Sequence, residues 1–353
     1  MNDFRRRARN ALLGLAMGDS IGWPAMFHRG RLLPGWTRRI RREMDAERED
    51  SGVLRVPMPF SLNGPADLFD LIPTDDTEWA AWTMLNLLKH GCVVDRDWVR
   101  DEWLALARGN ERILGGVSTV SALANLRCGL MPPVSGSDNP HYFDDGALCR
   151  AVPVGIAYAG SPVEAARAAE IEACVTNSED GVWAARSVAA AVSAACAGES
   201  AGYVVGAALE QLPEESWSRR SVRKALDICA GEGPVIALVP SLHALLNREY
   251  SDGCAGPETL ALALGIVSRM SDRFADAVTL ASSFAKGADA VPAVVGAIAG
   301  ALAGGTPVPL QWERPLGTLK GISIPALSGE DYILLIGRFV DACPVPRSRE
   351  EKT

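Results

Sequence analysis

Apolar residues recur at intervals of three and four along almost the whole chain, which is the spacing of helices that bury one face. The sequence has no series of alternating β-branched runs joined by Asn-Gly or Asp-Gly turns, so no sheet is predicted. Neither a fixed repeat nor a Ser/Gly linker divides it. We therefore expect an all-α, single compact multi-helix globule over residues 1–343, with a disordered tail at 344–353. The predicted helices are Phe4–Met17, Glu78–Lys89, Trp98–Ala107, Ser118–Leu126, Pro162–Glu172, Val182–Ala197, Ala201–Gln211, Ser221–Ala230, Val235–Asn247, Pro257–Met270, Ala275–Ala285 and Asp331–Ala342.

The charge balance argues against a nucleic-acid partner. Among 353 residues, 35 Lys and Arg stand against 43 Asp and Glu, a net charge of −8, so no broad basic surface is available for a phosphate backbone. The eight cysteines are far apart, with no C-x-x-C motif, so no zinc site is predicted. Buried reduced thiols in a cytoplasmic protein are the better interpretation.

Two apolar segments resemble a secretion signal and a transmembrane helix, but each lacks some of the features that define such a segment. Near the amino terminus, Asp19 ends the apolar run Ala11–Gly18 and no cleavage-type spacer follows, so we expect this segment to be part of the fold. Near the other end, Ala290–Trp312 carries no charge but consists largely of Ala, Gly and Pro, whose apolar drive is weak. Its glycines at 296, 300 and 304 share one helix face, which predicts a buried helix in close contact with another. We expect no membrane partner.

The most informative motif is Thr74-Asp75-Asp76-Thr77, which follows Pro73 and precedes a predicted helix. Thr and Asp are favoured at helix N-termini, so one carboxylate here needs no role beyond capping. Two successive carboxylates flanked by two hydroxyls exceed what capping requires. At a helix entrance they can converge, with a Thr oxygen, on a hard cation such as Mg²⁺. A cation site and a cap both remain open from these residues alone.

A second candidate is Asp289, which directly precedes the Gly-rich helix near the end of the chain. An N-cap is the simplest interpretation, and Pro292 in the first turn fits it. A functional role requires this helix entrance to face Asp75 and Asp76, which spacing alone does not reveal.

Three motifs in this order resemble the ADP-ribosylglycohydrolase family. They are GLAMGDSIG at 14–22, whose two glycines by themselves predict close helix packing, TDDTEWA at 74–80 and GADAVPAVVGAIAGALAG at 287–304. Between them, Gly146–Pro153 is similar to the family's G-x-x-x-R-x-x-P, and Cys174–Asn177 lies where many members have Thr-His. The resemblance covers nearly the whole chain.

The resemblance implies an all-α fold with a cleft that holds two Mg²⁺ ions, bound by two motifs. The first set of ligands maps to Thr74, Asp75 and Asp76. The second set is incomplete, because Gly287 and Ala290 stand where the family has Asp and Thr, and only Asp289 is retained. Mg²⁺ requires near-octahedral oxygen coordination, so these losses predict one bound ion, or a weak second one.

The same losses leave a metal-free reaction open. A ribosidic bond can break through an oxocarbenium-like state that carboxylates alone stabilise. In that case Asp75, Asp76 and Asp289 would stabilise the ribose cation and position water. Asp144 and Asp145 add acid near the predicted cleft, although a solvated turn is the alternative interpretation.

Substrate contacts are predicted at loop amides that open helices, because such amides bind phosphate. The candidates are Gly115, Gly116, Ser118, Thr119, Asp145 and Gly146. A turn followed by an N-cap explains the glycine pair about as well.

Other residues have weaker claims to a substrate contact. One arginine of Arg38–Asp50 is a candidate for a phosphate, although this charge-laced segment is more simply a solvated helix face. His28, His141, Trp79 and Trp82 are candidates too, with surface or packing roles as the default.

Together these features predict a cytoplasmic hydrolase that cleaves an N- or O-glycosidic bond of ADP-ribose or a related nucleotide. Thr74, Asp75, Asp76 and Asp289 are the predicted metal ligands, and the three carboxylates are the catalytic groups. A metal-independent N-ribosidase for a nucleotide-derived metabolite and a protein that binds ADP-ribose without cleaving it are the alternatives. All three need the side chains at 75 and 289 to meet across one hollow.

Overall fold

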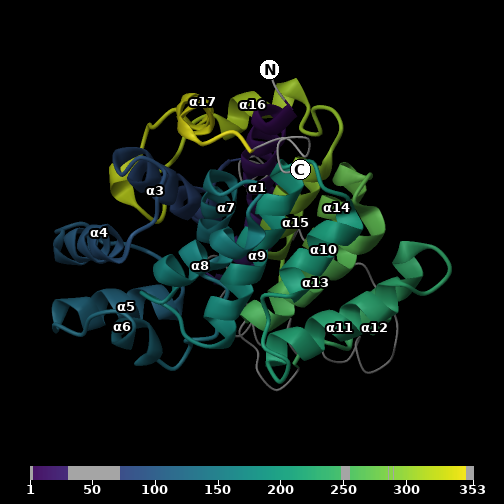
Figure 1. Ribbon diagram of the computed structural model, residues 1–353, viewed down its shortest axis with the longest axis horizontal. Helices are drawn as coiled ribbons and strands as arrows, with labels where there is room; N and C mark the ends of the chain where they lie inside the picture. Colours follow the sequence, from purple (N-terminus) through teal and green to yellow (C-terminus); the bar gives the residue numbers. More distant parts are fainter. Residues whose placement is uncertain (1–2, 31–71, 248–254, 285, 289, 347–353) are drawn as a thin grey trace, which may run out of the picture.

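The computed structural model describes residues 3–30, 72–247, 255–284, 286–288 and 290–346. Sixteen α-helices and no strand are present in those residues (Figure 1). Extended pairing in these ranges is limited to two isolated bridges, Asp144 with Ala255 and Thr318 with Asp331. The prediction of a compact all-α fold is confirmed. In chain order the helices are α1 (Asp3–Gly30), α3 (Asp75–Lys89), α4 (Arg96–Arg108), α5 (Val117–Arg127), α6 (Val134–Ser137), α7 (Leu148–Ala157), α8 (Pro162–Ala173), α9 (Asp180–Cys196), α10 (Ala201–Leu209), α11 (Trp217–Cys229), α12 (Val239–His243), α13 (Gly256–Met270), α14 (Phe274–Ser282), α15 (Ala290–Leu302), α16 (Leu310–Leu316) and α17 (Tyr332–Ala342).

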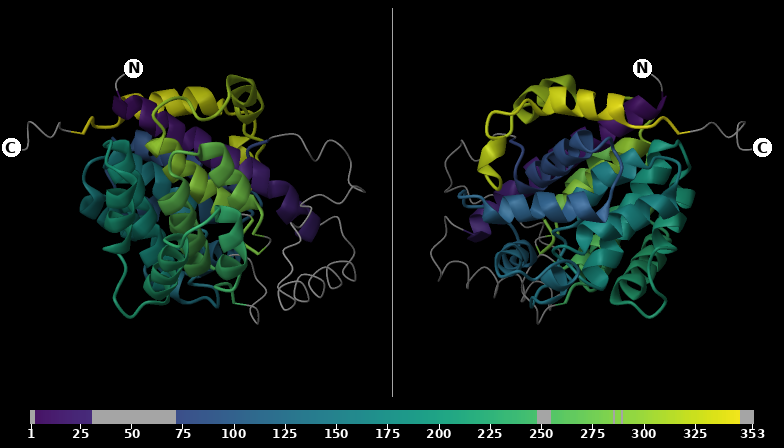
Figure 2. Two further views of the ribbon diagram at one scale, coloured as in Figure 1. Left: turned by 90° about the vertical axis from the view of Figure 1, so that its right-hand side faces the viewer. Right: turned by 60° about the vertical axis from the view of Figure 1, so that its left-hand side comes forward.

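The centre of the molecule is an antiparallel pair formed by α1 and α15 (Figures 1 and 2). A Cβ atom added to Gly14 would overlap the carbonyl oxygen of Gly296, and one added to Gly18 would overlap that of Pro292. The two helix backbones are therefore in direct contact, as the glycine spacing predicted. Every residue from 290 to 301 is buried, which makes α15 the core helix.

The glycine pattern of α15 ends earlier than predicted. Gly300 approaches Asn10 in the same way, but a Cβ at Gly304 would meet nothing within 4 Å. The helix stops at Leu302, so the predicted buried helix Ala290–Trp312 is correct only over its first part. No helix in the described ranges combines the length and the apolar character that a membrane crossing requires.

Other helices surround this pair. On one side α7, α9 and α13 pack against α15, with α8, α10 and α11 outside them. On the other side α3 and α17 contact α1, and Figure 2 shows α17 lying across the end of the molecule beside α1. This arrangement places the first and the last helices of the described residues in one core.

The structure contains three helices that the sequence did not predict, α6, α7 and α16. Every residue of α7 is buried and Pro153 lies inside it, so it has no polar face to give a periodic signal. The predicted helix Val235–Asn247 is instead a 3₁₀ turn at Val235–Leu238 followed by the short α12. Pro240 explains the break, because it has no N–H to donate to the preceding turn.

Five of the seven cysteines in the described residues are buried. Cys174 is partly buried and Cys128 is exposed, so the prediction of buried thiols is wrong for Cys128. All seven are free thiols.

Candidate active site

A buried carboxylate holds the entrance of α3 in place. Asp19, on α1, accepts hydrogen bonds from the backbone N–H groups of Thr74 (2.8 Å) and Thr77 (3.1 Å). Both threonine hydroxyls donate to the same carboxylate. Thr74 occupies the N-cap position, but its side chain makes no capping bond to the helix. The two threonines of the motif therefore serve to fix this entrance to α1 rather than to cap α3.

Asp19 was not among the predicted site residues, although it lies inside the GLAMGDSIG motif. Its neighbour Gly18 touches α15, while Asp19 itself binds the entrance of α3. Burial and the charge of Asp75 raise the pKa of Asp19 to about 7, against the lowering effect of the hydrogen bonds from Thr74 and Thr77. The signal available in the sequence was a charged residue between two glycines of an apolar helix.

The two predicted carboxylates, Asp75 and Asp76, lie in the first turn of α3 and are partly exposed. Partial burial of the Asp75 carboxylate raises its pKa. Hydrogen bonds from the backbone N–H groups of Asp75 and Asp76 and from the Thr74 side chain oppose this shift. Asp76 faces α7, where its charge and a hydrogen bond raise the pKa of the Cys149 thiol, in addition to the larger effect of burial. The charges of Asp19 and Asp145 reach the same thiol. Cys149 thus lies between the α3 entrance and the turn that carries Asp145.

That turn is built around Asp144, which is only 1% exposed. Its carboxylate accepts hydrogen bonds from the N–H (3.1 Å) and hydroxyl (2.7 Å) of Ser118, from the N–H of Gly146 (3.1 Å) and from the amide of Asn177 (2.9 Å). Asp145 accepts a hydrogen bond from the hydroxyl of Thr259 (2.7 Å). The alternative of a solvated turn is therefore wrong, because both carboxylates are buried.

The predicted substrate-binding residues do gather in one place. A Cβ added to Gly146 would lie within 4 Å of the side chains of Ser118 and Thr119, and one at Gly116 would lie 3.1 Å from Asp144. However, the N–H and hydroxyl of Ser118 already donate to Asp144, which occupies the N-terminus of α5 as an internal anion. A phosphate contact at this helix start would therefore fall to Gly115 and Gly116.

The buried side chain of Arg150 stabilises the turn that carries Asp144 and Asp145. Arg150 donates to the carboxylate of Glu172 (2.7 Å), the carbonyl of Gly146 (2.6 Å) and the hydroxyl of Thr176 (2.6 Å). Thr176 donates in turn to Asn177, the residue that holds Asp144. This chain of hydrogen bonds explains the G-x-x-x-R spacing, since the arginine reaches back one helical turn to the glycine.

Aromatic rings close the other side of α3. Trp79 stacks on Trp103 with centroids 5.5 Å apart, and Trp82 meets both rings edge-on. The guanidinium of Arg150 lies 5.0 Å from the Trp103 ring. Trp79 is buried, so its role is packing. His141 stacks on Phe143, which directly precedes the buried acidic turn.

Several predictions concern parts of the chain beyond these ranges. Asp289, the segment Arg38–Asp50 and the tail from 347 onward lie outside the described residues, as does the side chain of His28. The predicted meeting of Asp289 with Asp75 therefore stays a prediction.

Two of the predicted cation ligands, Thr74 and Asp75, lie side by side. The hydroxyl of Thr74 donates a hydrogen bond to Asp19, and its oxygen lies 3.4 Å from Oδ1 of Asp75. This oxygen set suits Mg²⁺. In the described ranges no group of three or more acidic, His or Cys side chains is arranged to hold a metal ion.

Gly287 has no side chain that could act as a ligand. A Cβ atom at this position would lie 2.7 Å from a methyl carbon of Val291, so a larger residue here would require that side chain to move. Ala290 begins α15 and is buried.

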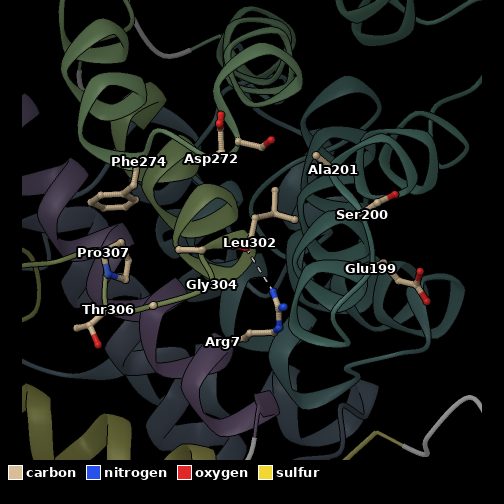
Figure 3. A pocket seen from close by; sticks show the side chains of 13 residues that line it. Arg7, Glu199, Ser200, Ala201, Asp272, Phe274, Leu302, Gly304, Thr306 and Pro307 are labelled. Carbon is tan, nitrogen blue, oxygen red and sulfur yellow. Dashed lines mark hydrogen bonds between the residues drawn. The ribbon is translucent and has the colours of Figure 1, made fainter.

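A hollow of about 490 Å³ lies elsewhere, at the C-terminal end of α15 (Figure 3). Arg7 lines it and donates to the carbonyls of Ala301 (2.8 Å) and Leu302 (3.4 Å). The contact of Gly18 with Pro292 places Asp19 at the opposite end of the α1–α15 pair. This hollow is therefore separate from the acidic site.

Comparison with known proteins identifies the family. The sequence pattern of the ADP-ribosylglycohydrolases matches residues 1–345. The chain belongs to the ADP-ribosylglycohydrolase family. Family membership indicates a glycosyl hydrolase for ADP-ribose-like substrates. No curated protein matches the chain.

A solved structure supports the fold of this family member. It is titled "ADP-ribosylglycohydrolase-related protein complex", is 23% identical, and superposes with a TM-score of 0.60 over 96% of this chain and 100% of that chain. At this level of identity the likeness establishes the fold.

Proposed function

We propose that the protein hydrolyses an N- or O-glycosidic bond between the ribose of ADP-ribose, or of a related nucleotide, and its leaving group. The observation that carries this proposal is the pair of partly exposed carboxylates, Asp75 and Asp76, on a helix entrance that buried Asp19 holds in place. Asp145 adds a third carboxylate nearby. An acidic site of this kind favours a ribose ring that becomes positively charged as its bond breaks.

The reaction adds water across the ribosidic bond. The bond from C1′ to the leaving nitrogen or oxygen breaks, the oxygen of water bonds to C1′, and a proton passes to the leaving group. Asp75 and Asp76 stabilise the charge on the ribose, and one of them accepts the proton of the attacking water. Gly115 and Gly116, at the start of α5, are the proposed contacts for the diphosphate.

We further propose that Thr74, Asp75, Asp76 and Asp289 hold one Mg²⁺ ion. When bound, the ion would supply positive charge that orients the substrate oxygens and lowers the pKa of a water. Asp19 would support this set by accepting the hydrogen bond of the Thr74 hydroxyl, which would direct the oxygen lone pairs of that hydroxyl away from Asp19.

The decisive experiment compares matched Asp→Asn variants of the full chain. Substrates are ADP-ribosylated peptides carrying the sugar on Arg or Ser, and small nucleotides, with release of ADP-ribose or ribose followed by chromatography. Asp75→Asn and Asp76→Asn should each lower kcat at least 100-fold. Asp95→Asn, at the exposed N-cap of α4, should leave it unchanged. Wild-type rates in both site variants would refute the proposal.

Thermal shift and chelation separate the alternatives. ADP-ribose together with Mg²⁺ should raise Tm more than either alone, because only the folded protein binds them. Full activity in EDTA would favour the metal-independent N-ribosidase. A shift with ADP-ribose but no turnover of any substrate would identify a binding protein, in line with the missing ligand side chain at Gly287.

A further inference from the structure

Two thiols outside the proposed chemistry lie side by side in the structure. The sulfur atoms of Cys92 and Cys343 are 4.0 Å apart, although the residues are 251 positions apart in the sequence. Both side chains are buried, with 2% and 5% of their surface exposed. Cys92 follows the C-terminal end of α3, and Cys343 follows the last residue of α17. The pair therefore sits where these two helices end.

Neither cysteine lies within a helix. Cys92 occupies the turn after α3 with φ of +60°, and Cys343 has extended backbone angles directly before Pro344. A disulfide requires the sulfur atoms to approach to about 2.05 Å, which is about 2 Å closer than they lie. Side-chain rotation together with small shifts of these two non-helical segments can provide that movement.

We propose that Cys92 and Cys343 form a redox-sensitive pair, which peroxide converts to a disulfide that fastens α17 to the end of α3. In the first step the sulfur of Cys92 attacks peroxide, so an S–O bond forms, the O–O bond breaks and water leaves. The Cys343 sulfur then attacks the Cys92 sulfur, an S–S bond forms, the S–O bond breaks and a second water leaves. Two thiols are oxidised and one hydrogen peroxide is reduced.

The hydrogen bond between the two thiols assigns their roles. Cys343 donates to Cys92, and this lowers the pKa of Cys92 despite its burial. The same bond, together with burial, raises the pKa of Cys343. The hydrogen bond therefore favours Cys92 as the thiol that reacts first, since the thiolate is the reactive form. Cys343 resolves the intermediate.

The disulfide would add a second attachment to an existing one. At the other end of α3, Glu78 accepts hydrogen bonds from three backbone N–H groups of residues 322–324, in the segment that leads to α17. Oxidation would therefore attach both ends of the segment from residue 322 to Cys343 to α3 and the turn that follows it. Because the link would close a loop of 251 positions, it would restrict the unfolded chain strongly. We expect the oxidised protein to melt about 5 °C higher than the reduced one.

The test uses the full chain with Cys128→Ser and Cys254→Ser, which removes the exposed thiol and one outside the described residues. The folded protein is treated with hydrogen peroxide, blocked with N-ethylmaleimide and mapped by mass spectrometry. The expected result is a peptide pair joined through Cys92 and Cys343, and a rise in Tm that dithiothreitol reverses. Cys92→Ser and Cys343→Ser should each abolish the rise.

Cys196 is the matched control. It is also buried and close enough for its charge to act on Cys343. Cys196→Ser should keep both the link and the rise in Tm. A predominant link between Cys196 and Cys343, or no link between Cys92 and Cys343 in folded protein, would overturn the proposal. The peptide map is made on a chain that retains all three of these thiols, so it decides the question even if a serine variant does not fold.

Discussion

Asp19 shows how much a single buried carboxylate can organise. Replacing Asp19 with Asn keeps the shape but turns two acceptor oxygens into one, so some of its four donors lose their partner. We expect a loss of about 2–4 kcal/mol in the free energy of unfolding, because buried unpaired donors are costly. Denaturant unfolding followed by circular dichroism measures this.

The control for that variant is Asp331→Asn. Asp331 is exposed and accepts one hydrogen bond, from the N–H of Leu334 (2.9 Å), at the start of α17. Asn caps helices about as well as Asp, so we expect a change within about 0.5 kcal/mol. Equal losses in the two variants would show that the threonine contacts of Asp19 contribute little.

Glu78 is a second residue whose role could not be inferred from the TDDTEWA motif that contains it. Its carboxylate accepts three backbone N–H bonds, of 2.8, 2.7 and 3.1 Å, from Ile322, Ser323 and Ile324. Glu78→Gln places an amide group against these donors and should cost about 2 kcal/mol. Glu111→Gln is the control, because exposed Glu111 accepts one bond from the same loop, from Ala326. Similar unfolding midpoints for both variants would contradict this expectation.

At the scale of elements, the contact of α1 with α15 depends on glycine. Gly14→Ala would push the helices apart, because its Cβ would overlap the Gly296 carbonyl. We expect a loss of more than about 3 kcal/mol in unfolding free energy. Gly206→Ala on α10, where a Cβ meets nothing within 4 Å, should instead gain about 0.5–1 kcal/mol. Melting temperatures of the two variants should move in opposite directions.

The helices that the sequence predicted are those with one buried face. Periodicity located α4 and α11, whose exposed sides carry charge, but it missed α7, which is buried on every side. For the site, the sequence pointed to the α3 entrance because two adjacent carboxylates exceed a cap. It did not reveal the partner of Thr74, since Asp19 lies 55 positions away. Long-range hydrogen bonds leave no local pattern.

At the scale of the whole molecule, the first and the last described helices, α1 and α17, share one core. The first helix contacts α15, α16 and α17, and the hydroxyl of Tyr332 donates to the carbonyl of Leu12 (3.1 Å). We therefore expect one cooperative unfolding transition, with equal calorimetric and van't Hoff enthalpies. Scanning calorimetry at several scan rates tests this. Two resolved transitions would show that the chain contains separate folding units.

The pairing of the first helix with a helix near the end of the chain also bears on synthesis. A ribosome adding roughly 5–20 residues per second needs on the order of 15–60 seconds after α1 emerges to produce α15. During that interval the glycine-rich, apolar side of α1 faces water without its partner. Nascent chains of this protein should therefore depend on chaperones that shield an early apolar helix, and should mature only after release.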